Sequence, residues 1–177
     1  MKVSIIIINF NTFQLTRNCI HSVVEQTRGV EYEIILVDNN SSECDPENFS
    51  KDFPSVILIK NKINAGFAGG NNLGIQIAKG QYVLLLDSDT YLKEDTISKS
   101  IAYMEQYPLA GVPECRMTFA DGAVQHTARH FKIISCELLN IFRFIPMLMP
   151  YNKRSKFDAG KIFSVQCGYV CSQVGGR

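Results

Sequence analysis

The sequence has almost no net charge. Its 177 residues include 18 lysines and arginines and 17 aspartates and glutamates, which leave a formal charge of +1 at pH 7. This balance gives the protein no overall attraction to nucleic acid. The sequence also lacks a long apolar run at its start, because Val3–Ile8 is shorter than the roughly 7–15 apolar residues of a secretory signal. We therefore expect a cytoplasmic protein, for which a place at the inner face of the cytoplasmic membrane is left open.

Metal-binding spacings built from cysteine or histidine are also missing. The closest of the six cysteines, Cys167 and Cys171, have no second pair at zinc-finger spacing. His126 and His130 lie four residues apart, but the residues between them offer no acidic partner of the zinc-protease kind. Scattered cysteines without a secretion signal indicate free thiols in a reducing compartment.

Short apolar runs alternate with helical patterns through the first hundred residues. Runs that are β-branched and apolar throughout are typical of strands buried on both faces of a parallel sheet. Strand–helix alternation predicts an α/β fold, with a mainly parallel central sheet and helices on both faces. The expected strands are Val3–Ile8, Glu33–Val37, Val56–Ile59 and Tyr82–Leu86, and the expected helices are Thr12–Gln26, Ala65–Ala78 and Glu94–Tyr107.

The pattern changes after Pro108, so we divide the chain into 1–110 and 111–177. Arg116–Arg129 has the pattern of a hairpin that turns at an Asp-Gly pair. The later segment Leu138–Lys161 combines an apolar run with an excess of basic residues. The run is shorter than the about 20 residues of a membrane span. Exposed, the segment would lie at a membrane surface; packed, it would be an ordinary helix on the sheet.

Asparagine or aspartate follows each expected strand. Ligands of parallel α/β sheets bind at the carboxyl ends of the strands, which lie at one edge. Any single cluster is also typical of a solvated loop, but four together favour a binding cleft. The clusters are Asn9–Asn11, Asp38–Ser41, Asn61–Asn72 and Asp87–Asp89.

The sharpest of these clusters is LLLDSDTYL, which places Asp87 and Asp89 just after a buried strand. Two carboxylates at this spacing make a compact anionic site for a hard divalent cation, Mg²⁺ or Mn²⁺. A diphosphate would add further oxygen ligands, and the cation would act as a Lewis acid as the bond to that leaving group breaks. In the alternative interpretation Asp87 is a turn residue, and Asp89 or Thr90 caps the next helix.

Two further clusters suggest a nucleotide. Asp38 can accept the imide N–H of uracil or thymine, while Phe10 offers a stacking face, although Asp38 could equally be an Asx-turn residue. The glycine-rich stretch Asn61–Gly74 would begin a helix near Ala65 and aim free N–H groups at a phosphate. It has neither the spacing of a dinucleotide fingerprint nor the lysine of a P-loop.

Taken together, VSIIIINFNT, IILVDNNSS, N-x-x-N-x-G-F-A-x-x-N-N-x-G and LLLDSDT resemble the inverting nucleotide-diphospho-sugar transferases of the large bacterial family 2, and most closely its rhamnosyltransferase-like members. The resemblance implies a Rossmann-like GT-A fold, a UDP- or dTDP-sugar donor and a glycan or lipid-linked acceptor. It implies Mg²⁺ or Mn²⁺ held chiefly by Asp89, with Asp87 facing the ribose or the metal, and the base held by Asp38. The candidate nucleotide-sugar-binding residues are Phe10, Asn11, Asp38, Asn64, Gly66, Asn71 and Asp87.

The same resemblance makes 1–110 the nucleotide-sugar-binding half and 111–177 the start of the acceptor-side half. The family's general base follows a segment equivalent to Gly175-Gly176, so we expect it beyond Arg177 and expect this chain to transfer sugar poorly. One alternative is a nucleotide-sugar-binding module without transfer activity. A remote alternative is a phosphatase of the haloacid dehalogenase superfamily with Asp87 as nucleophile, but the motif of that superfamily normally lies near the start of the chain.

Overall fold

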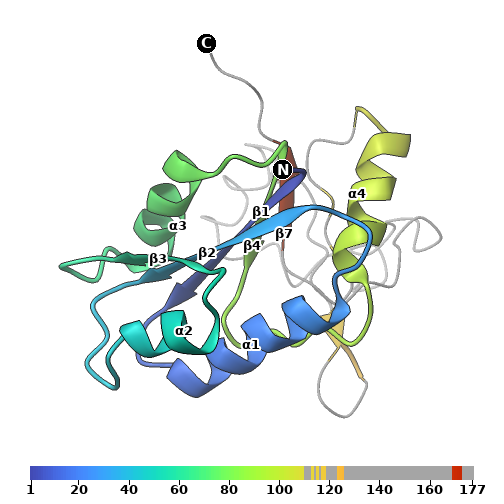
Figure 1. Cartoon of the computed structure of the whole chain (residues 1–177). Coiled ribbons are helices and arrows are strands. Elements are labelled where there is room, and N and C mark those ends of the chain that lie inside the picture. Colours follow the sequence, from blue (N-terminus) through green and yellow to red (C-terminus); the bar gives the residue numbers. More distant parts are fainter. Residues whose placement is uncertain (110–112, 114, 116, 119–122, 126–168, 173–177) are drawn as a thin grey trace, which may run out of the picture.

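A five-stranded sheet forms the centre of the fold (Figure 1). The computed structural model describes residues 1–109, 113, 115, 117–118, 123–125 and 169–172. Within them, the strand order is β3-β2-β1-β4-β7. The strands are β1 (Val3–Asn9), β2 (Tyr32–Asp38), β3 (Ile57–Lys60), β4 (Tyr82–Leu86) and β7 (Tyr169–Ser172).

The first four strands are parallel, and β1 lies between β2 and β4. The chain runs outward from β1 through β2 to β3 and then returns to the other side of β1 as β4. The strand order therefore reverses between β1 and β4, which is the position where open α/β sheets form their ligand crevice. β7 adds antiparallel to the outer edge of β4.

Helices cover both faces of the sheet, as Figure 1 shows. One face packs on α1 (Phe13–Gln26), α2 (Glu47–Asp52) and α4 (Thr96–Gln106), and the other packs on α3 (Gly66–Ile77). Alternate residues of β1 serve the two faces, because side chains of a strand point to opposite sides. Ile5 and Ile7 join the first core cluster and Ile6 the second. Strand β1 is largely apolar because both of its faces are buried.

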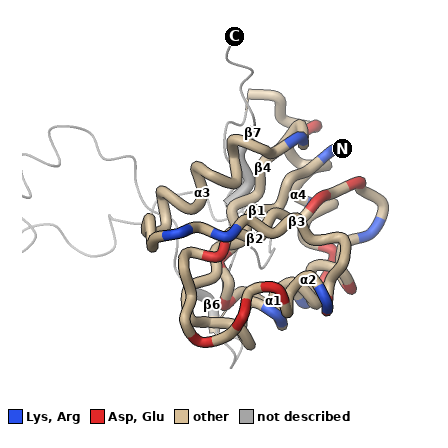
Figure 2. The backbone as a smooth tube through the Cα atoms, turned by 60° about the vertical axis from the view of Figure 1, so that its left-hand side comes forward, with Lys and Arg blue, Asp and Glu red and all other residues tan. Residues whose placement is uncertain are grey.

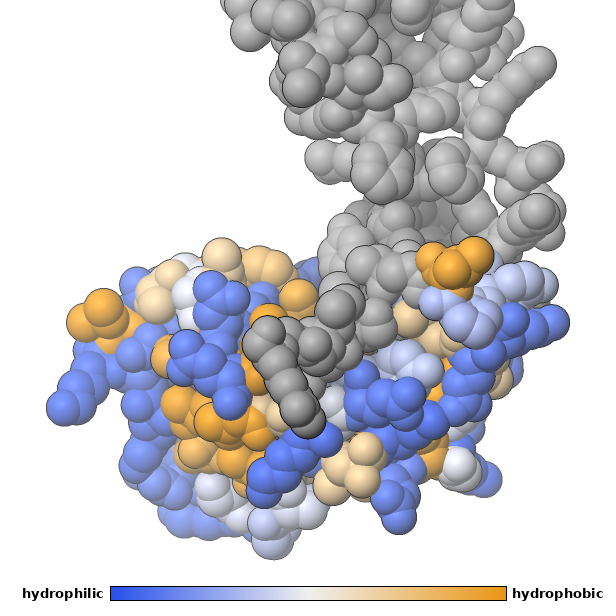
Figure 3. Space-filling model, turned by 90° about the horizontal axis from the view of Figure 1, so that it is seen from above, coloured by the Kyte–Doolittle hydropathy of each residue, from blue (hydrophilic) through white to orange (hydrophobic). Residues whose placement is uncertain are grey.

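Glycines let α3 lie close to β1. A Cβ at Gly74 would stand 2.6 Å from Cγ2 of Ile6, and one at Gly70 would stand 3.0 Å from Cδ1 of Ile8. The helix leaves some apolar surface on its outer side, where Ile75 and Ile77 are about two-fifths exposed. Figure 3 shows apolar groups gathered among hydrophilic surface on the face that is seen from above.

The sequence-based elements are largely confirmed. All four expected strands and all three expected helices form, with ends shifted by at most two residues. The hairpin is confirmed by antiparallel pairing of β5 (Met117–Thr118) with β6 (Val124–Gln125). Sequence reasoning missed α2 and β7. Helix α2 has six residues of which only Phe49 is buried, so it carries no periodic pattern. Strand β7 is four residues long and joins the sheet antiparallel.

Some expectations fall on residues outside the described part. These include His126, His130, Cys167 and the segment Leu138–Lys161. Among the cysteines described with their side chains, Cys19 and Cys44 are free thiols, as expected. None of the helices in the described residues has the length and apolarity that a membrane span requires.

The tight turn before β4 gives a test of the fold. A Cβ at Gly80 would lie 2.4 Å from the backbone N of Ser4 and 2.6 Å from the carbonyl carbon of Val3. Backbone atoms inside a sheet cannot move aside cheaply, so Gly80→Ala should cost about 3 kcal/mol, the upper end of the range for overpacking. The measurement is the free energy of unfolding in urea, followed by circular dichroism because the sequence has no tryptophan.

A matched control is Gly29→Asn. Gly29 has φ +76°, no atom lies within 4 Å of the position that a Cβ would take there, and asparagine tolerates this backbone region. This variant should change the stability by less than about 0.5 kcal/mol. Equal stability of the two variants would contradict the close approach at Gly80.

Candidate functional site

A cleft of about 460 Å³ opens at the carboxyl ends of β1 and β4, beside the start of α3. This is the position where the strand order reverses. The lining residues come from the ends of β1 and β4, the loops after β1, β2 and β4, the loop before α3, and the first turns of α1 and α3. The lining residues are Ile8, Phe10, Thr12, Leu15, Asn39, Asn64, Gly66, Phe67, Leu86, Asp87, Ser88 and Asp89.

Five of the residues expected from the sequence line this cleft, namely Phe10, Asn64, Gly66, Asp87 and Asp89. Phe10 is 44% exposed although it is a large apolar side chain, so its ring is available to a planar ligand. Asn11, Asp38 and Asn71 do not line the cleft. Each of these three is described below.

Asp38 ends β2 directly beside Asn9, the last residue of β1. Its Oδ1 accepts a hydrogen bond of 2.7 Å from Nδ2 of Asn9, and its Oδ2 accepts one of 3.0 Å from the N–H of Ser41. Asp38 is only 2% exposed. The bond to Ser41 is the turn interaction that the sequence left open for this residue. These two hydrogen bonds use one lone pair on each oxygen of Asp38, so each oxygen can still accept another donor.

Asn11 connects the loops after β1 and β2. Its φ is +53°, in the left-handed region that asparagine adopts more readily than most residues. Its Oδ1 accepts the N–H groups of Ser42 at 2.8 Å and of Glu43 at 3.2 Å, and its own N–H donates to Oγ of Ser41 at 3.1 Å. The side chain of Asn11 therefore holds the two loops together rather than lining the cleft.

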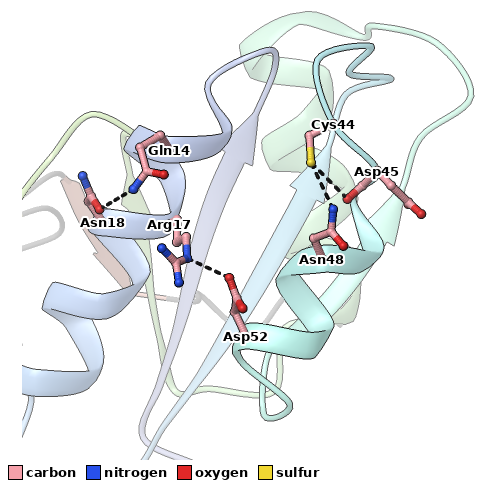
Figure 4. A network of polar contacts seen from close by, with 7 residues as sticks. All are labelled: Gln14, Arg17, Asn18, Cys44, Asp45, Asn48 and Asp52. Atoms are coloured by element: carbon pink, nitrogen blue, oxygen red, sulfur yellow. Dashed lines mark hydrogen bonds and ion pairs between the residues drawn. The ribbon is translucent and has the colours of Figure 1, made fainter.

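The loop after β2 is also tied to α1 through α2 (Figure 4). Nε of Arg17 in α1 donates to Oδ2 of Asp52 at 2.7 Å. At the other end of α2, Nδ2 of Asn48 donates to Sγ of Cys44 at 3.1 Å. These contacts fix the outer side of the loop whose inner side carries Asp38.

The start of α3 presents free backbone donors to the cleft. Gly66 has φ +69°, its N–H donates to Oδ1 of Asn64 at 2.8 Å, and its carbonyl accepts from Nδ2 of Asn39 at 3.0 Å. The N–H groups of a first helical turn have no partners inside the helix and carry partial positive charge. Figure 2 shows lysines along the end of β3 and the loop that follows, beside this helix start. Of these, Lys60 pairs with Glu47, whereas Lys62 forms no ion pair within the described residues.

Asn71 lies one turn further along α3 than Phe67. It is 4% exposed, and its Nδ2 has no hydrogen-bond partner within the described residues. A buried amide without a partner is costly in a folded protein. The Nδ2 of Asn71 is thus an unused donor, although Asn71 does not line the cleft.

The two carboxylates after β4 are exposed at the cleft. The pKa of Asp87 is raised, first because the surrounding protein removes part of its water and second because Asp89 is negatively charged nearby. The turn is formed by the backbone, since the N–H of Thr90 donates to the carbonyl of Asp87 at 3.0 Å. The next helix, α4, is capped by Asp95, whose side chain accepts from the N–H of Ser98. The carboxylates of Asp87 and Asp89 thus neither form the hydrogen bond of the turn nor cap α4.

A buried thiol lies beneath this pair. Sγ of Cys19 donates to the backbone carbonyl of Asp87 at 3.6 Å. Burial, followed by the charges of Asp89 and Asp87, raises the pKa of this thiol to about 12. The thiol is therefore neutral at physiological pH and does not act as a nucleophile. Within the described residues, no group of three or more His, Cys, Asp or Glu side chains could hold a metal ion.

Sequence reasoning missed several lining residues. Phe67 is 55% exposed and Leu15 49% exposed, and both present apolar surface to the cleft. Phe67 could have been found, because a phenylalanine in the first turn of a helix that starts at a ligand edge has no core to enter. Leu15 has the same helical spacing as the buried Cys19 and Ile20, so the pattern alone does not reveal that Leu15 lies exposed at the cleft.

Comparison with known proteins supports a common fold and family. The sequence model of Glycosyl transferase family 2 matches residues 4–169. A UDP-Glc:alpha-D-GlcNAc-diphosphoundecaprenol beta-1,3-glucosyltransferase of Escherichia coli is 39% identical over 108 residues, which are 58% of this chain and 41% of that protein.

Two solved structures show the same α/β fold. S. aureus TarS 1-349 in complex with UDP superimposes with a TM-score of 0.64 at 22% identity, over 75% of this chain and 40% of that one. A mannosyltransferase from Pyrobaculum calidifontis, in complex with GDP-Man and Mn²⁺, gives a TM-score of 0.60 at 20% identity, over 66% of this chain and 36% of that one. The chain spans less than half of the length of each of these three proteins.

The carboxylate pair should weaken the fold when no cation is present. A raised pKa means that Asp87 binds its proton more tightly in the folded state than in the unfolded state. The stability of the parent therefore falls as pH rises from the ordinary value of 3.8 through the raised pKa. We expect Asp87→Asn to be more stable than the parent at pH 7 in EDTA, with a difference that shrinks toward pH 4.

Urea unfolding at both pH values measures this effect. Asp45→Asn is the matched control, because Asp45 is exposed and lies outside the cleft lining. It should not stabilise the protein at pH 7. If Asp87→Asn were no more stable than the parent at pH 7, neither the loss of water nor the charge of Asp89 would penalise the carboxylate of Asp87 in the folded protein.

Proposed function

The chain belongs to glycosyl transferase family 2, and we propose that it transfers a sugar from a pyrimidine nucleoside diphosphate to a glycan or lipid-linked acceptor with inversion. The observation that carries this proposal is the composition of the cleft. It combines an exposed aromatic ring, an open helix start and two exposed carboxylates that the fold does not use. The family match spans the D-x-D-x-T motif and so favours a transferase over a haloacid dehalogenase-type phosphatase.

The nucleoside would bind between the loops after β1 and β2. Phe10 offers its exposed ring for stacking. Asp38 would accept the imide N–H of uracil or thymine with a lone pair that Asn9 and Ser41 leave free. Because Asp38 is 2% exposed, only the edge of a base could reach it. A base that stacks its face on the ring of Phe10 would point its edge toward Asp38.

The diphosphate would lie at the start of α3. Its negative charge is complementary to the free N–H groups of the first helical turn. Gly66 has no side chain to block a close approach, and Asn64 and Phe67 flank it in the cleft. Asn71 has an Nδ2 without a partner in the described part of the chain, and we assign it as a candidate donor to the sugar or phosphate.

The residues present fit a divalent cation. Asp87 and Asp89 are close enough for the charge of one to raise the pKa of the other. Such a pair attracts Mg²⁺ or Mn²⁺, and oxygen ligands are what these ions prefer. We assign Asp89 as the main ligand, with Asp87 facing the ribose or the ion. The bound ion would neutralise the charge that develops on the departing diphosphate. The Mn²⁺ of the solved mannosyltransferase is consistent with this assignment.

The residues of this chain would bind and orient the donor so that its anomeric carbon faces the acceptor. Inversion follows from in-line attack on the side opposite to the diphosphate, and needs a general base near the acceptor hydroxyl. None of the cleft residues is assigned to that role. The resemblance to rhamnosyltransferase-like members stays a prediction from the sequence. An acceptor assay separates transfer from the alternative of donor binding alone.

A lipid-linked acceptor is supported by one relative. The E. coli glucosyltransferase acts, by its name, on a diphosphoundecaprenol-linked sugar. An acceptor of that kind lies at a membrane surface, and the basic and apolar segment Leu138–Lys161 could contact such a surface. This role for the segment stays a prediction from the sequence.

Binding of UDP should depend on the cation. Calorimetric titration of UDP in Mn²⁺ or Mg²⁺ should show tight binding that weakens at least about tenfold in EDTA, because the diphosphate and the two carboxylates otherwise repel each other. Asp89→Asn should bind UDP in Mn²⁺ about as weakly as the parent does in EDTA. Equal affinity of the parent with and without the cation would exclude a metal-bridged diphosphate.

Asp38→Ala should weaken binding of UMP by about 10- to 100-fold, since a hydrogen bond to a charged group contributes about 1.5–3 kcal/mol. Affinity for Mn²⁺ should change little. Asp38→Asn keeps the size of the side chain and serves as a second variant if the alanine variant folds poorly. Unchanged UMP affinity in a folded variant would leave Asp38 as a turn residue only.

A further inference from the structure

Asn9 is a buried amide that no binding role has yet used. It is the last residue of β1, 2% exposed and paired in register with Asp38. Its Nδ2 donates to Oδ1 of Asp38 at 2.7 Å and to Oγ of Ser41 at 2.9 Å. The orientation of the amide is fixed, because an ionised carboxylate only accepts hydrogen bonds and must face the NH₂ group.

The other end of the same amide faces α1. Oδ1 of Asn9 accepts from Oγ1 of Thr16 at 2.8 Å and from Oγ1 of Thr12 at 3.2 Å. Oγ1 of Thr12 in turn lies 3.4 Å from Oγ of Ser88, the residue between the two exposed aspartates. One amide is therefore connected to the loops after β1, β2 and β4. Each donor and acceptor of the Asn9 side chain has a partner within the protein.

We infer that Asn9 is a positioning residue for base selection: its amide holds the carboxylate of Asp38 in the orientation that chooses uracil or thymine over cytosine. The inference rests on the proposed function, because it requires Asp38 to meet the base. A carboxylate distinguishes these bases at N3, which carries a proton in uracil and thymine and is an acceptor in cytosine. Without the amide, the side chain of Asp38 can rotate, and its oxygens then no longer face the N–H at N3 of uracil or thymine.

The same strand pair offers a matched control at its opposite end. Oγ of Ser4 donates to Oε1 of Glu33 at 2.6 Å, and these residues are also paired in register. Both are buried, at 0% and 7% exposed. Ser4→Ala therefore removes a buried hydrogen bond to a carboxylate between β1 and β2, but far from the cleft. It should reduce stability without changing the choice of base.

The experiment measures dissociation constants of UMP and CMP in EDTA, so that no metal contributes. We expect the parent to prefer UMP, and expect Asn9→Ala to lower the UMP-to-CMP preference at least about fivefold while Ser4→Ala keeps it. Asn9→Asp has the same shape but places an acceptor against Asp38, and it should lose the preference at pH 7 as well. In an Asp38→Ala background, adding Asn9→Ala should cause no further change, because a residue that acts through Asp38 has nothing left to position.

The outcomes separate the two ideas. If Asp38→Ala loses the preference but a folded Asn9→Ala or Asn9→Asp keeps it, the inference about Asn9 is wrong and the proposed function stands. Additive losses in the double variant would also overturn it, since Asn9 would then act independently of Asp38. If the parent shows no preference for UMP, or Asp38→Ala keeps it, the assignment of Asp38 in the proposed function fails.

Discussion

The parallel register of β1 with its two neighbours is the constraint on which the site depends. It places Asn9 opposite Asp38 on one side, while β4 ends on the other side just before Asp87. A slip of one residue would turn every side chain of β1 to the opposite face and bury the wrong set. The register is held by the core itself, because the fully buried Ile5 and Ile7 pack on one face and Ile6 on the other. The apolar core thus determines which polar residues meet at its end.

The two faces of the sheet support the cleft in different ways. On the side of α1, the core is continuous and includes side chains as large as Phe49 and Ile20. On the side of α3, glycines bring the helix backbone close to β1, so that its first turn reaches the cleft. The cleft itself contributes little to stability, because it exposes Phe10 and Phe67 and keeps two like charges together. Binding sites commonly carry such unfavourable features, whose cost the rest of the fold must offset.

The elements with strong sequence patterns could be predicted. Strand β1 belongs to this group because a strand buried on both faces is a continuous apolar run. Helices α1 and α3 belong to it because burial of one helical face repeats apolar residues at helical spacing. Helix α2 and strand β7 could not be predicted, since they are short and depend on partners that are distant in sequence.

The same division holds in the site. Asp87 and Asp89 were recognisable from the sequence as candidate ligands, because two carboxylates directly follow a buried strand. The contacts of Asn9 were not, because they join it to Asp38 and continue through Thr12 to the loop after β4. Asn11 was expected to meet the ligand, but its side chain holds the loop after β2. Contacts between loops that are distant in sequence leave no local pattern, so only the folded chain reveals them.

The carboxylates at this edge of the sheet differ in how their charge is compensated, and this difference suits them to different tasks. Asp38 is buried and already receives two hydrogen bonds from the protein, which hold its oxygens in place for the N–H of a base in the proposed function. Asp87 and Asp89 are exposed, and the charge of Asp89 helps to raise the pKa of Asp87, so the pair suits the divalent cation of the proposed function. Exchanging the two environments would defeat both tasks. A cation at Asp38 would compete with the base, while hydrogen bonds that neutralised Asp87 would weaken its attraction for the metal.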